Sequence, residues 1–482
     1  MFTVLTLILF SLFSFNSSGL LFWFVLGMLY FFVHFNYSFF ISNNLWMGNM
    51  EMLDSLAYYF IFLSMLVVLF IILVGVNENV FFLVNIILLI ILIGFFMSMN
   101  ALFLFVFFES SFILMFIIIM LWGNNPERIE ALNYFLIYSM VGSVPLLVSI
   151  VFIQEGLSVM GMFTWLVGMI SSGSISHNDF SSAPVVVMDL ELNGFFVGVE
   201  DECEVISFFF GSQIVFFFWV MVFLFKFPAF GVHLWLPKAH VESPVFGSML
   251  LAGIMIKLGV VGIYRFFFSG KSMFWDINVV SFLFFYFCLS IFLVNFICSR
   301  QYDLKSFVAY SSIVHMALIL ISIWSGSVLS IVGSLMMSFA HGLCSSALFL
   351  NLTCFYTLSS SRNIVINSGF LYNNSLLSFF WFILCVLNCA IPIGLNFFSE
   401  IFLIFSGISF SLWSLVAFSF NIIFCGFYCI ILYVYVSHGK NSLILNYGIN
   451  FKNSYVIFLV LWYHFFLAYF YFFCFNNVGF FL

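Results

Sequence analysis

Apolar runs of about 20 residues recur along almost the whole of this sequence, separated by short polar stretches. A helix of that length spans the hydrocarbon core of a bilayer, which is roughly 30 Å thick. Only 6% of the 482 residues are charged and 65% are hydrophobic, so the chain cannot cover the surface of a soluble domain. Helices satisfy their own backbone in lipid, and no alternating β-barrel pattern is present. The sequence therefore predicts an all-α polytopic membrane protein.

We expect about fourteen transmembrane helices from the apolar runs. Their approximate ranges are 1–14, 20–41, 56–76, 80–98, 101–122, 131–153, 205–227, 246–268, 274–297, 306–325, 328–357, 376–405, 409–436 and 455–475. The first run, MFTVLTLILF, lacks the basic residues that begin a secretory signal or a transit peptide. We therefore expect the first helix to be retained.

The predicted helices 4–8 and 9–13 form two units of five, and an odd number of helices per unit makes the two copies inverted. Pro228 and Pro392 break helices 7 and 12, the fourth helix of each unit. Proline kinks without a transport role are common, so this pattern alone leaves both interpretations open. We expect the N-terminal helices at 1–98, of which helix 4, at about 80–98, begins the first repeat. The rest of the first repeat is expected at 99–270, the second repeat at 274–436 and a C-terminal helix at 437–482.

Basic residues in the predicted loops indicate the orientation of the chain. An even number of helices puts both termini on one side, and the basic residues then divide seven to two between the two faces. One face receives Arg128, Lys238, Arg300, Lys305, Arg362, Lys440 and Lys452, and the other receives Arg265 and Lys271. The termini are therefore expected on the side away from the cytoplasm or mitochondrial matrix.

Four ionisable side chains lie within apolar runs instead of in loops. Lys257 is about ten residues from either end of its run, close to the midplane of a bilayer, while Lys226, Glu109 and Glu400 are similarly enclosed. Each charge at such a depth costs roughly 2.5–3.5 kcal/mol on insertion scales. A structural ion pair between Glu109 and Lys226 is one explanation, but buried pairs are often replaceable by apolar residues without loss of stability. We favour an ion or proton pathway.

Two histidines, His315 and His341, also occupy apolar runs next to small hydroxyl residues. Each alone is as compatible with a hydrogen-bonded packing role as with proton transfer. Together with Glu109, Lys226, Lys257 and Glu400 they place one titratable group in each of helices 5, 7, 8, 10, 11 and 12. Burial disfavours a charged lysine and a nearby carboxylate favours it, so a bundle of these helices predicts a proton relay.

Several stretches resemble a known family. HLWLPKAHVESP at 233–244 runs into GSMLLAGIMIKLG, and further matches are ESSFILMFIIIMLWGNNPERIEALNYFLIYSMVGSVPLL, AYSSIVHMALI and FAHGLCSSALF. Together they cover roughly residues 100–405 and resemble the chain-four family of NADH:ubiquinone oxidoreductase, respiratory complex I. The relatives of that family include the other antiporter-like chains of the complex and the large subunits of multisubunit cation/proton antiporters.

The resemblance implies fourteen helices with two inverted five-helix repeats, and a role for each buried group. Glu109 and Lys226 match the family's helix-5 glutamate and helix-7 lysine, Lys257 its central lysine, His315 the histidine that assists it, His341 the helix-11 histidine, and Glu400 the acid of the proton exit. His233, His240, Lys238 and Glu242 lie in or beside the signature, as a secondary relay or an interface. Ser399 stands where a glycine is usual, and Pro392 is single where a proline pair is common, so Glu400 is the least secure match.

The resemblance also implies partners and a location. The implied partners are other membrane-arm subunits of complex I, especially neighbouring antiporter-like chains, and lipids such as cardiolipin. The implied location is the mitochondrial inner membrane, with both termini on the intermembrane-space side. NADH, FMN, iron–sulfur clusters and ubiquinone are expected in partner subunits, and none in this chain. The ten cysteines show no CxxC pair or metal-ligand spacing, and no basic stripe suits nucleic acid.

Three questions stay open at this level. The acidic stretch 171–204 fits a solvated loop better than a docking site for an accessory subunit, and calcium-loop spacing is absent. A subunit of a multisubunit sodium(cation)/proton antiporter would use the same buried charges. A structural scaffold is the third class, and it predicts that Lys257→Met leaves transport intact.

Overall fold

The computed structural model of the chain describes residues 45–48, 51–53, 55–74, 79–98, 100–123, 125–156, 218–270, 277–392, 394–439 and 454–470. The predicted spans 1–14 and 20–41, the acidic stretch 171–204 and the first part of the predicted span 205–227 lie outside these residues. Lys271, Lys440 and Lys452, which entered the orientation argument, also lie outside them.

The first half of the described chain consists of long apolar helices followed by a broken region. The long helices are α3 (Ser55–Val74), α4 (Asn79–Met97), α5 (Ala101–Trp122) and α6 (Arg128–Gly156). Residues 218–226 are helical, and after them come α10 (Trp235–Glu242), α11 (Val245–Leu250), the π-helical turn η2 (Leu251–Met255) and α12 (Ile256–Gly270). Elements α11, η2 and α12 follow one another directly and correspond to the predicted span 246–268.

The second half repeats this alternation of long and broken helices. Its elements are α13 (Ile277–Ser299), α14 (Leu304–Ser325), α15 (Val328–Ser359), α16 (Phe370–Asn373), α17 (Ser375–Asn388), α18 (Leu395–Phe410), α19 (Ser414–Ser437) and α20 (Ser454–Phe470). The segment 376–405, which the sequence predicted as a single span, consists of two helices, α17 and α18. The helix breaks around Pro392, as expected because proline lacks the backbone N–H that a helix needs.

One small element departs from the all-α prediction. Strands β1 (Leu45–Gly48) and β2 (Glu51–Leu53) pair antiparallel just before α3, with a register shift between Trp46 and Gly48. Backbone groups between membrane helices must also be paired or hydrated, and a short ladder satisfies them where no helix continues. The hairpin does not alter the helical architecture.

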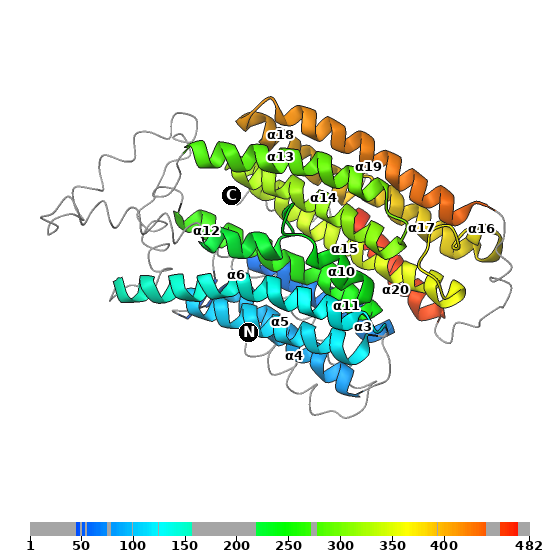
Figure 1. The fold of residues 1–482 in the computed structure, drawn as a ribbon, viewed down its shortest axis with the longest axis horizontal. Helices are drawn as coiled ribbons and strands as arrows, with labels where there is room; N and C mark the ends of the chain where they lie inside the picture. Colours follow the sequence, from blue (N-terminus) through cyan, green and yellow to red (C-terminus); the bar gives the residue numbers. More distant parts are fainter. Residues whose placement is uncertain are drawn as a thin grey trace, which may run out of the picture.

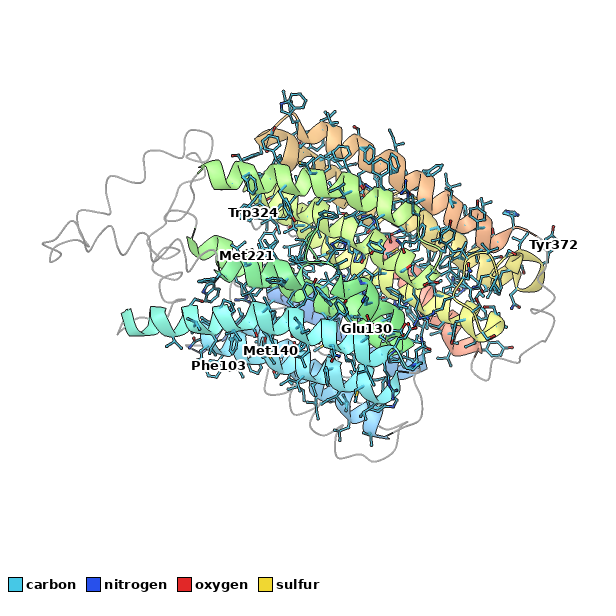
Figure 2. The ribbon with its side chains drawn as sticks, in the orientation of Figure 1. Phe103, Glu130, Met140, Met221, Trp324 and Tyr372 are labelled. Atoms are coloured by element: carbon cyan, nitrogen blue, oxygen red, sulfur yellow. The ribbon has the colours of Figure 1, made fainter. Side chains whose placement is uncertain are left out.

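Nine helices in the described part of the chain are long and apolar enough to cross a membrane, and α17, α18 and most of α20 are shorter apolar helices. Large apolar side chains face outward on the peripheral helices, among them Phe103 of α5, 39% exposed, and Met140 of α6, 46% exposed (Figure 2). Such an outer surface suits lipid and not water. The chain is a multi-pass membrane protein.

The centre of the bundle is formed by helices that are buried along most of their length. α15 crosses the middle of the molecule, with α3 to α6 on one side and α18 and α19 on the other (Figure 1). The membrane-spanning part of α15 is 100% buried and that of α14 is 94% buried, against 39% for α5 and α19. Groups carried by α14 and α15 therefore lie away from both lipid and bulk water.

Two helix breaks flank this centre. The helical segment 218–226 ends at Lys226, and α10 begins only at Trp235 after Pro228. The second break separates α17 from α18, and there Ala390 adopts a left-handed backbone conformation with φ 55°. Both breaks coincide with the predicted proline positions, and each lies next to a buried ionisable residue.

Candidate functional site

Lys257 lies at the centre of the bundle, in the first turn of α12. Its side chain is fully buried, and its Nζ donates a hydrogen bond to the carbonyl of Ala252 in the π-helical turn. A π-helical turn frees carbonyls from the regular helical pattern, and such turns are frequent at functional sites. The lysine therefore obtains a backbone acceptor at a depth where no water is needed to satisfy it.

A second partner of Lys257 comes from α15. Its Nζ lies 3.0 Å from Nδ1 of His341. This contact depends on a close approach of two backbones, because a Cβ on Gly342 would lie 3.1 Å from the carbonyl oxygen of Gly253. Glycine at position 342 lets η2 and α15 touch, so the amine and the imidazole meet.

The row continues from His341 to Glu400. The rings of His341 and His315 have centroids 5.7 Å apart, a distance that one bridging water can span. His315 Nδ1 then lies 3.6 Å from Oε1 of Glu400 on α18. Lys257, His341, His315 and Glu400 thus form a continuous row across α12, α15, α14 and α18.

Glu109 and Lys226 form a second cluster between α5 and the segment 218–226. The two charges interact electrostatically, but no ion-pair contact within 4.0 Å joins them in the described part of the chain. Lys226 instead lies over the ring of Phe112, at 3.6 Å from the centroid, with Phe108 at 4.8 Å and Phe135 at 5.8 Å. An aromatic cage stabilises a desolvated ammonium through the ring quadrupoles. The structural ion pair considered above is therefore not the main environment of Lys226.

Close helix packing brings the two clusters near each other. A Cβ on Gly259 would lie 2.8 Å from Cβ of Phe227, and a Cβ on Gly262 would lie 2.1 Å from the ring of Phe223. The segment that carries Lys226 therefore packs directly on α12, two residues along from Lys257. No direct contact between Lys226 and Lys257 is present, so water or a conformational change is needed to join them.

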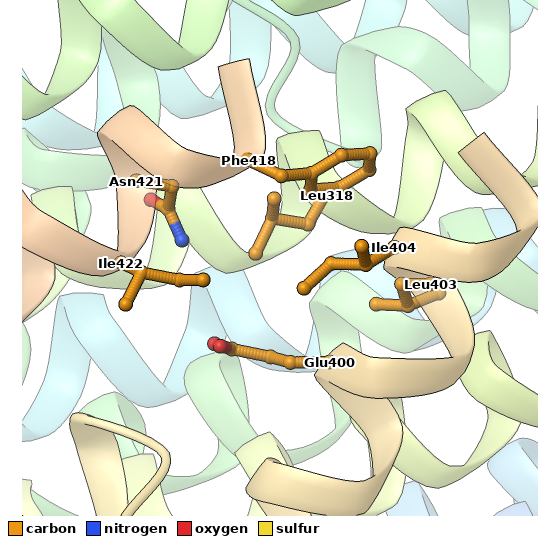
Figure 3. A pocket seen from close by; sticks show the side chains of 7 residues that line it. All are labelled: Leu318, Glu400, Leu403, Ile404, Phe418, Asn421 and Ile422. Atoms are coloured by element: carbon orange, nitrogen blue, oxygen red, sulfur yellow. The ribbon is translucent and has the colours of Figure 1, made fainter. Parts of the chain in front are cut away.

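A pocket opens beside Glu400, between α14, α18 and α19. Leu318, Glu400, Leu403, Ile404, Phe418, Asn421 and Ile422 line about 180 Å³ of empty space (Figure 3). The carboxyl group of Glu400 points toward the amide of Asn421 across it (Figure 3). The space is too narrow for a water-sized sphere in this conformation, so hydration of Glu400 from this side needs a small movement of α18 or α19.

The two signature histidines have different surroundings. Nδ1 of His233 accepts a hydrogen bond from the amide of Gly231 at 3.1 Å, and its ring stacks on Phe230 and meets Tyr310 of α14 edge-on at 6.0 Å between centroids. His240 is fully buried against Phe349 of α15, and neither ring nitrogen has a hydrogen-bond partner among the described residues. An unpartnered buried imidazole suits proton transfer better than packing, so His240 is the stronger of the two candidates.

The other two signature residues lie at the end of the bundle. Lys238 is 41% exposed and pairs with Glu130 of α6 at 2.8 Å, and this hydrogen-bonded pair raises the pKa of Lys238 above its usual value. Glu242 is buried and pairs with Arg362 at 3.3 Å. Lys238 is thus an exposed surface contact, whereas Glu242 belongs to a contact between the two halves of the chain.

Two polar residues near the row were missed by the sequence interpretation. Asn388 of α17 lies 3.2 Å from Nε2 of His315. His464 of α20 lies 3.0 Å from the hydroxyl of Ser346 on α15 and is almost fully buried. The signal that indicated His315, a lone histidine in an apolar helix, also applies to His464, whereas nothing in the sequence connects Asn388 to a histidine 73 positions earlier.

The arrangement as a whole suits proton transfer. An ammonium at Lys257 can donate to Nδ1 of His341, which can release a proton from Nε2, and a carboxyl group stands at the far end. Within the described residues, no group of three or more His, Cys, Asp and Glu side chains could hold a metal ion.

The sequence is similar to known proteins along most of its length. Residues 98–425 match the model of the family described as NADH:quinone oxidoreductase/Mrp antiporter, TM. NADH-ubiquinone oxidoreductase chain 4 of Ceratitis capitata is 33% identical over 438 residues, which cover 87% of both chains. The protein of the same name from Aedes aegypti is 35% identical over 341 residues, 70% of this chain and 66% of that one.

A solved structure shares the fold. A chain in the structure of respiratory complex I from Thermus thermophilus with bound NADH has a TM-score of 0.74 to this chain at 19% identity, and the match covers 97% of this chain and 94% of that one. At that identity the likeness concerns the fold alone. The family model and the curated relatives settle the family: this chain belongs to the NADH:quinone oxidoreductase/Mrp antiporter transmembrane family.

Proposed function

We propose that this chain is a proton-translocating, antiporter-like membrane subunit of NADH:ubiquinone oxidoreductase in the mitochondrial inner membrane. The curated relatives that it matches over most of its length are named as chain 4 of that enzyme. The observation that carries the proposal is the row of neighbouring groups from Lys257 through His341 and His315 to Glu400 in the most buried part of the bundle.

The row transfers protons one group at a time. Lys257 holds a proton between the Ala252 carbonyl and His341, and release toward His341 sends a charge along His315 to Glu400. Moving one charge against 100 mV requires about 2.3 kcal/mol, which a change of under two pKa units supplies. A small electrostatic change near Lys257 is therefore enough to drive a step.

Glu109 and Lys226 supply that electrostatic change. When Glu109 is drawn away from Lys226, the ammonium in its aromatic cage loses its nearby negative charge and releases its proton toward Lys257. The close packing of Phe227 on Gly259 keeps the two lysines on adjoining helices. Redox chemistry in other subunits would drive this cycle, and this chain itself would carry no redox centre.

The finer architecture belongs to the same proposal. Two inverted five-helix repeats in a fourteen-helix chain explain why both breaks lie beside a buried charge. The proposed domain limits are those given above, and both termini would face the intermembrane space. Other membrane-arm subunits, cardiolipin and an accessory subunit on residues 171–204 are the proposed partners, while NADH, FMN, iron–sulfur clusters and ubiquinone would bind elsewhere.

Substitution of Lys257 tests the function. In the intact complex reconstituted into vesicles, Lys257→Met is expected to assemble and to oxidise NADH with a lowered ratio of protons moved to electrons transferred. Lys238→Met is the matched control, because Lys238 is exposed and outside the row. An unchanged proton ratio in an assembled Lys257→Met complex would refute the channel role and favour a scaffold.

A subunit of a cation/proton antiporter would use the same buried groups. The two functions are therefore distinguished by the proteins that copurify with the chain and by the ions that are transported. An antiporter subunit would copurify with antiporter chains and exchange sodium for protons without NADH. The relatives' names favour the oxidoreductase. Sodium-driven proton movement in the absence of NADH would reverse this preference.

A further inference from the structure

We propose that Asn388 is a positioning residue for the relay. Asn388 holds neutral His315 as the Nε2-protonated tautomer and so directs the Nδ1 lone pair toward Glu400. This inference rests on the proposed proton relay and names a residue on which its last step depends.

The hydrogen bonds of the Asn388 amide define the tautomer. Asn388 is 5% exposed at the end of α17, with Oδ1 3.2 Å from Nε2 of His315 and Nδ2 3.5 Å from Sγ of Cys429. The Nδ2 group donates to the sulfur, so Oδ1 remains to face the imidazole, and a carbonyl oxygen can only accept. His315 must therefore carry its proton on Nε2.

Residues of α19 and α18 hold the main chain around Asn388 in place. The Cys425 thiol donates to the main-chain carbonyl of Asn388 at 3.5 Å, and the Tyr428 hydroxyl donates to the Cys425 sulfur at 3.1 Å. On the other side of the break, Nδ2 of Asn396 donates to the carbonyl of Leu387 at 2.7 Å. The main chain of Asn388 is thus held from α19 and, through Leu387, from α18, while the Cys429 sulfur holds the side-chain amide that faces the ring.

The opposite face of the imidazole is where the mobile proton moves. Nδ1 of His315 and Oε1 of Glu400 are 3.6 Å apart, and neither atom has a hydrogen-bond partner among the residues that the structure describes. With Nε2 protonated, the pair holds one further proton, either on the Glu400 carboxyl or on Nδ1. The groups that face His315 are Glu400 from α18, His341 from α15 and Asn388 from α17.

A neutral acceptor at position 388 suits both states of His315. The amide oxygen accepts from Nε2 whether the ring is neutral or an imidazolium, so it favours the tautomer without trapping the charge. A carboxylate of the same shape would stabilise the imidazolium form of His315. An aliphatic side chain would remove the acceptor and so destabilise the imidazolium. The two substitutions therefore act in opposite directions.

The test compares the pH dependence of NADH-driven proton uptake in vesicles that contain the intact complex. Asn388→Asp is expected to move the pH of half-maximal uptake upward by about one unit or more, and Asn388→Leu to move it downward by a similar amount. Asn388→Gln, which keeps an amide acceptor, is expected to have a midpoint between those of the Asp and Leu variants. Asn85→Leu is the control for loss of a buried asparagine, since among the described residues Asn85 of α4 bonds only to the Phe81 carbonyl of its own helix.

Three outcomes would overturn the inference. The first is a shift of the pH midpoint in the same direction in the Asp and Leu variants, and the second is a midpoint in the Asn388 variants equal to that of Asn85→Leu. The third is failure of all three Asn388 variants to assemble, which would show that Asn388 has a structural role. Glu400→Gln separates this failure from that of the proposed function. If Glu400→Gln abolishes uptake while the Asn388 midpoints stay unchanged, the relay stands and the positioning role does not; if Glu400→Gln has no effect, both are wrong.

Discussion

Lys226 shows how a buried ammonium can be kept with few polar partners. Its Nζ lies over Phe112 and near Phe108 and Phe135, and the Glu109 carboxyl acts on it only from beyond ion-pair distance. Aromatic rings favour the charged form weakly, so the lysine can still lose its proton when the carboxylate moves. A tight ion pair would hold the charge in place and would be a poor relay group.

Phe112→Leu tests this cage. Loss of the nearest ring is expected to disfavour the ammonium by about 0.5–2 kcal/mol, roughly a 2- to 30-fold change in its protonation equilibrium. The half-maximal pH of NADH-driven proton uptake should therefore fall. Phe103→Leu on the same helix is the control, because Phe103 points outward. Equal pH profiles for the two variants would show that the cage has no part in proton transfer.

At the residue scale, the sequence predicted the ionisable groups but not their polar neighbours. Membrane depth alone indicated Glu109, Lys226, Lys257 and Glu400, since a charge is conspicuous in an apolar run. Asn388 carries no charge, and its importance arises only from the approach of α17 to α14. The relay roles themselves stay predictions until transport is measured.

At the scale of elements, the contact between η2 and α15 decides whether the central row is continuous. Lys257 reaches His341 because Gly342 lets α15 approach the Gly253 carbonyl of η2. The sequence predicted one helix over 246–268, but nothing in its hydropathy marks the π-helical turn, because a one-residue change of helical pitch leaves the apolar run intact. Proline chemistry did predict the breaks after Lys226 and before Glu400.

Gly342→Ala tests the importance of this contact. The added methyl group would lie 2.8 Å from Cδ2 of Leu63 and 3.1 Å from the Gly253 carbonyl oxygen, an overpacking that costs about 1–3 kcal/mol. We expect a lower thermal unfolding midpoint of the purified complex and reduced proton uptake. Gly426→Ala on α19 is the control, since no atom of the described residues lies within 4 Å of the new methyl group. Equal behaviour of the two variants would contradict the account.

At the scale of the whole molecule, a cluster of charges joins the two halves at one end of the bundle. Arg362 donates to the Val241 carbonyl at 2.9 Å and pairs with Glu242, while Nζ of Lys305 lies 3.0 Å from the Ser243 carbonyl oxygen. Both cations therefore bind the C-terminal end of α10, where the helix dipole is negative. The cluster ties the first broken helix to α14 and the loop after α15.

Arg362→Gln is expected to weaken this connection. Loss of charge-assisted hydrogen bonds from a partly buried guanidinium should destabilise the folded chain by about 1.5–3 kcal/mol. Thermal unfolding of the purified complex measures the effect, with Arg300→Gln as the control because Arg300 is exposed. A midpoint for Arg362→Gln no lower than that of Arg300→Gln would show that the cluster does not hold the halves together.

At the scale of the whole molecule, the sequence predicted the helices but not how they pack together. Apolar runs predict which segments are helical and in what order they follow, because each span is encoded locally. Which helices are central is a matter of three-dimensional packing, and the full burial of α15 next to α14 could not be read from hydropathy, since peripheral helices such as α5 are even more apolar. The fourteen-helix count and the inverted repeats stay predictions, because the first two spans lie outside the described residues.

The central claim is that Lys257, His341, His315 and Glu400 form one path, and a double-mutant measurement tests it most directly. The proton-to-electron ratio would be measured for Lys257→Met, His341→Leu and the double variant in the reconstituted complex. Groups in series predict that each single substitution lowers the ratio to the same value and that the double variant lowers it no further. A double variant with a lower ratio than either single variant, or single variants with the wild-type ratio, would contradict the account.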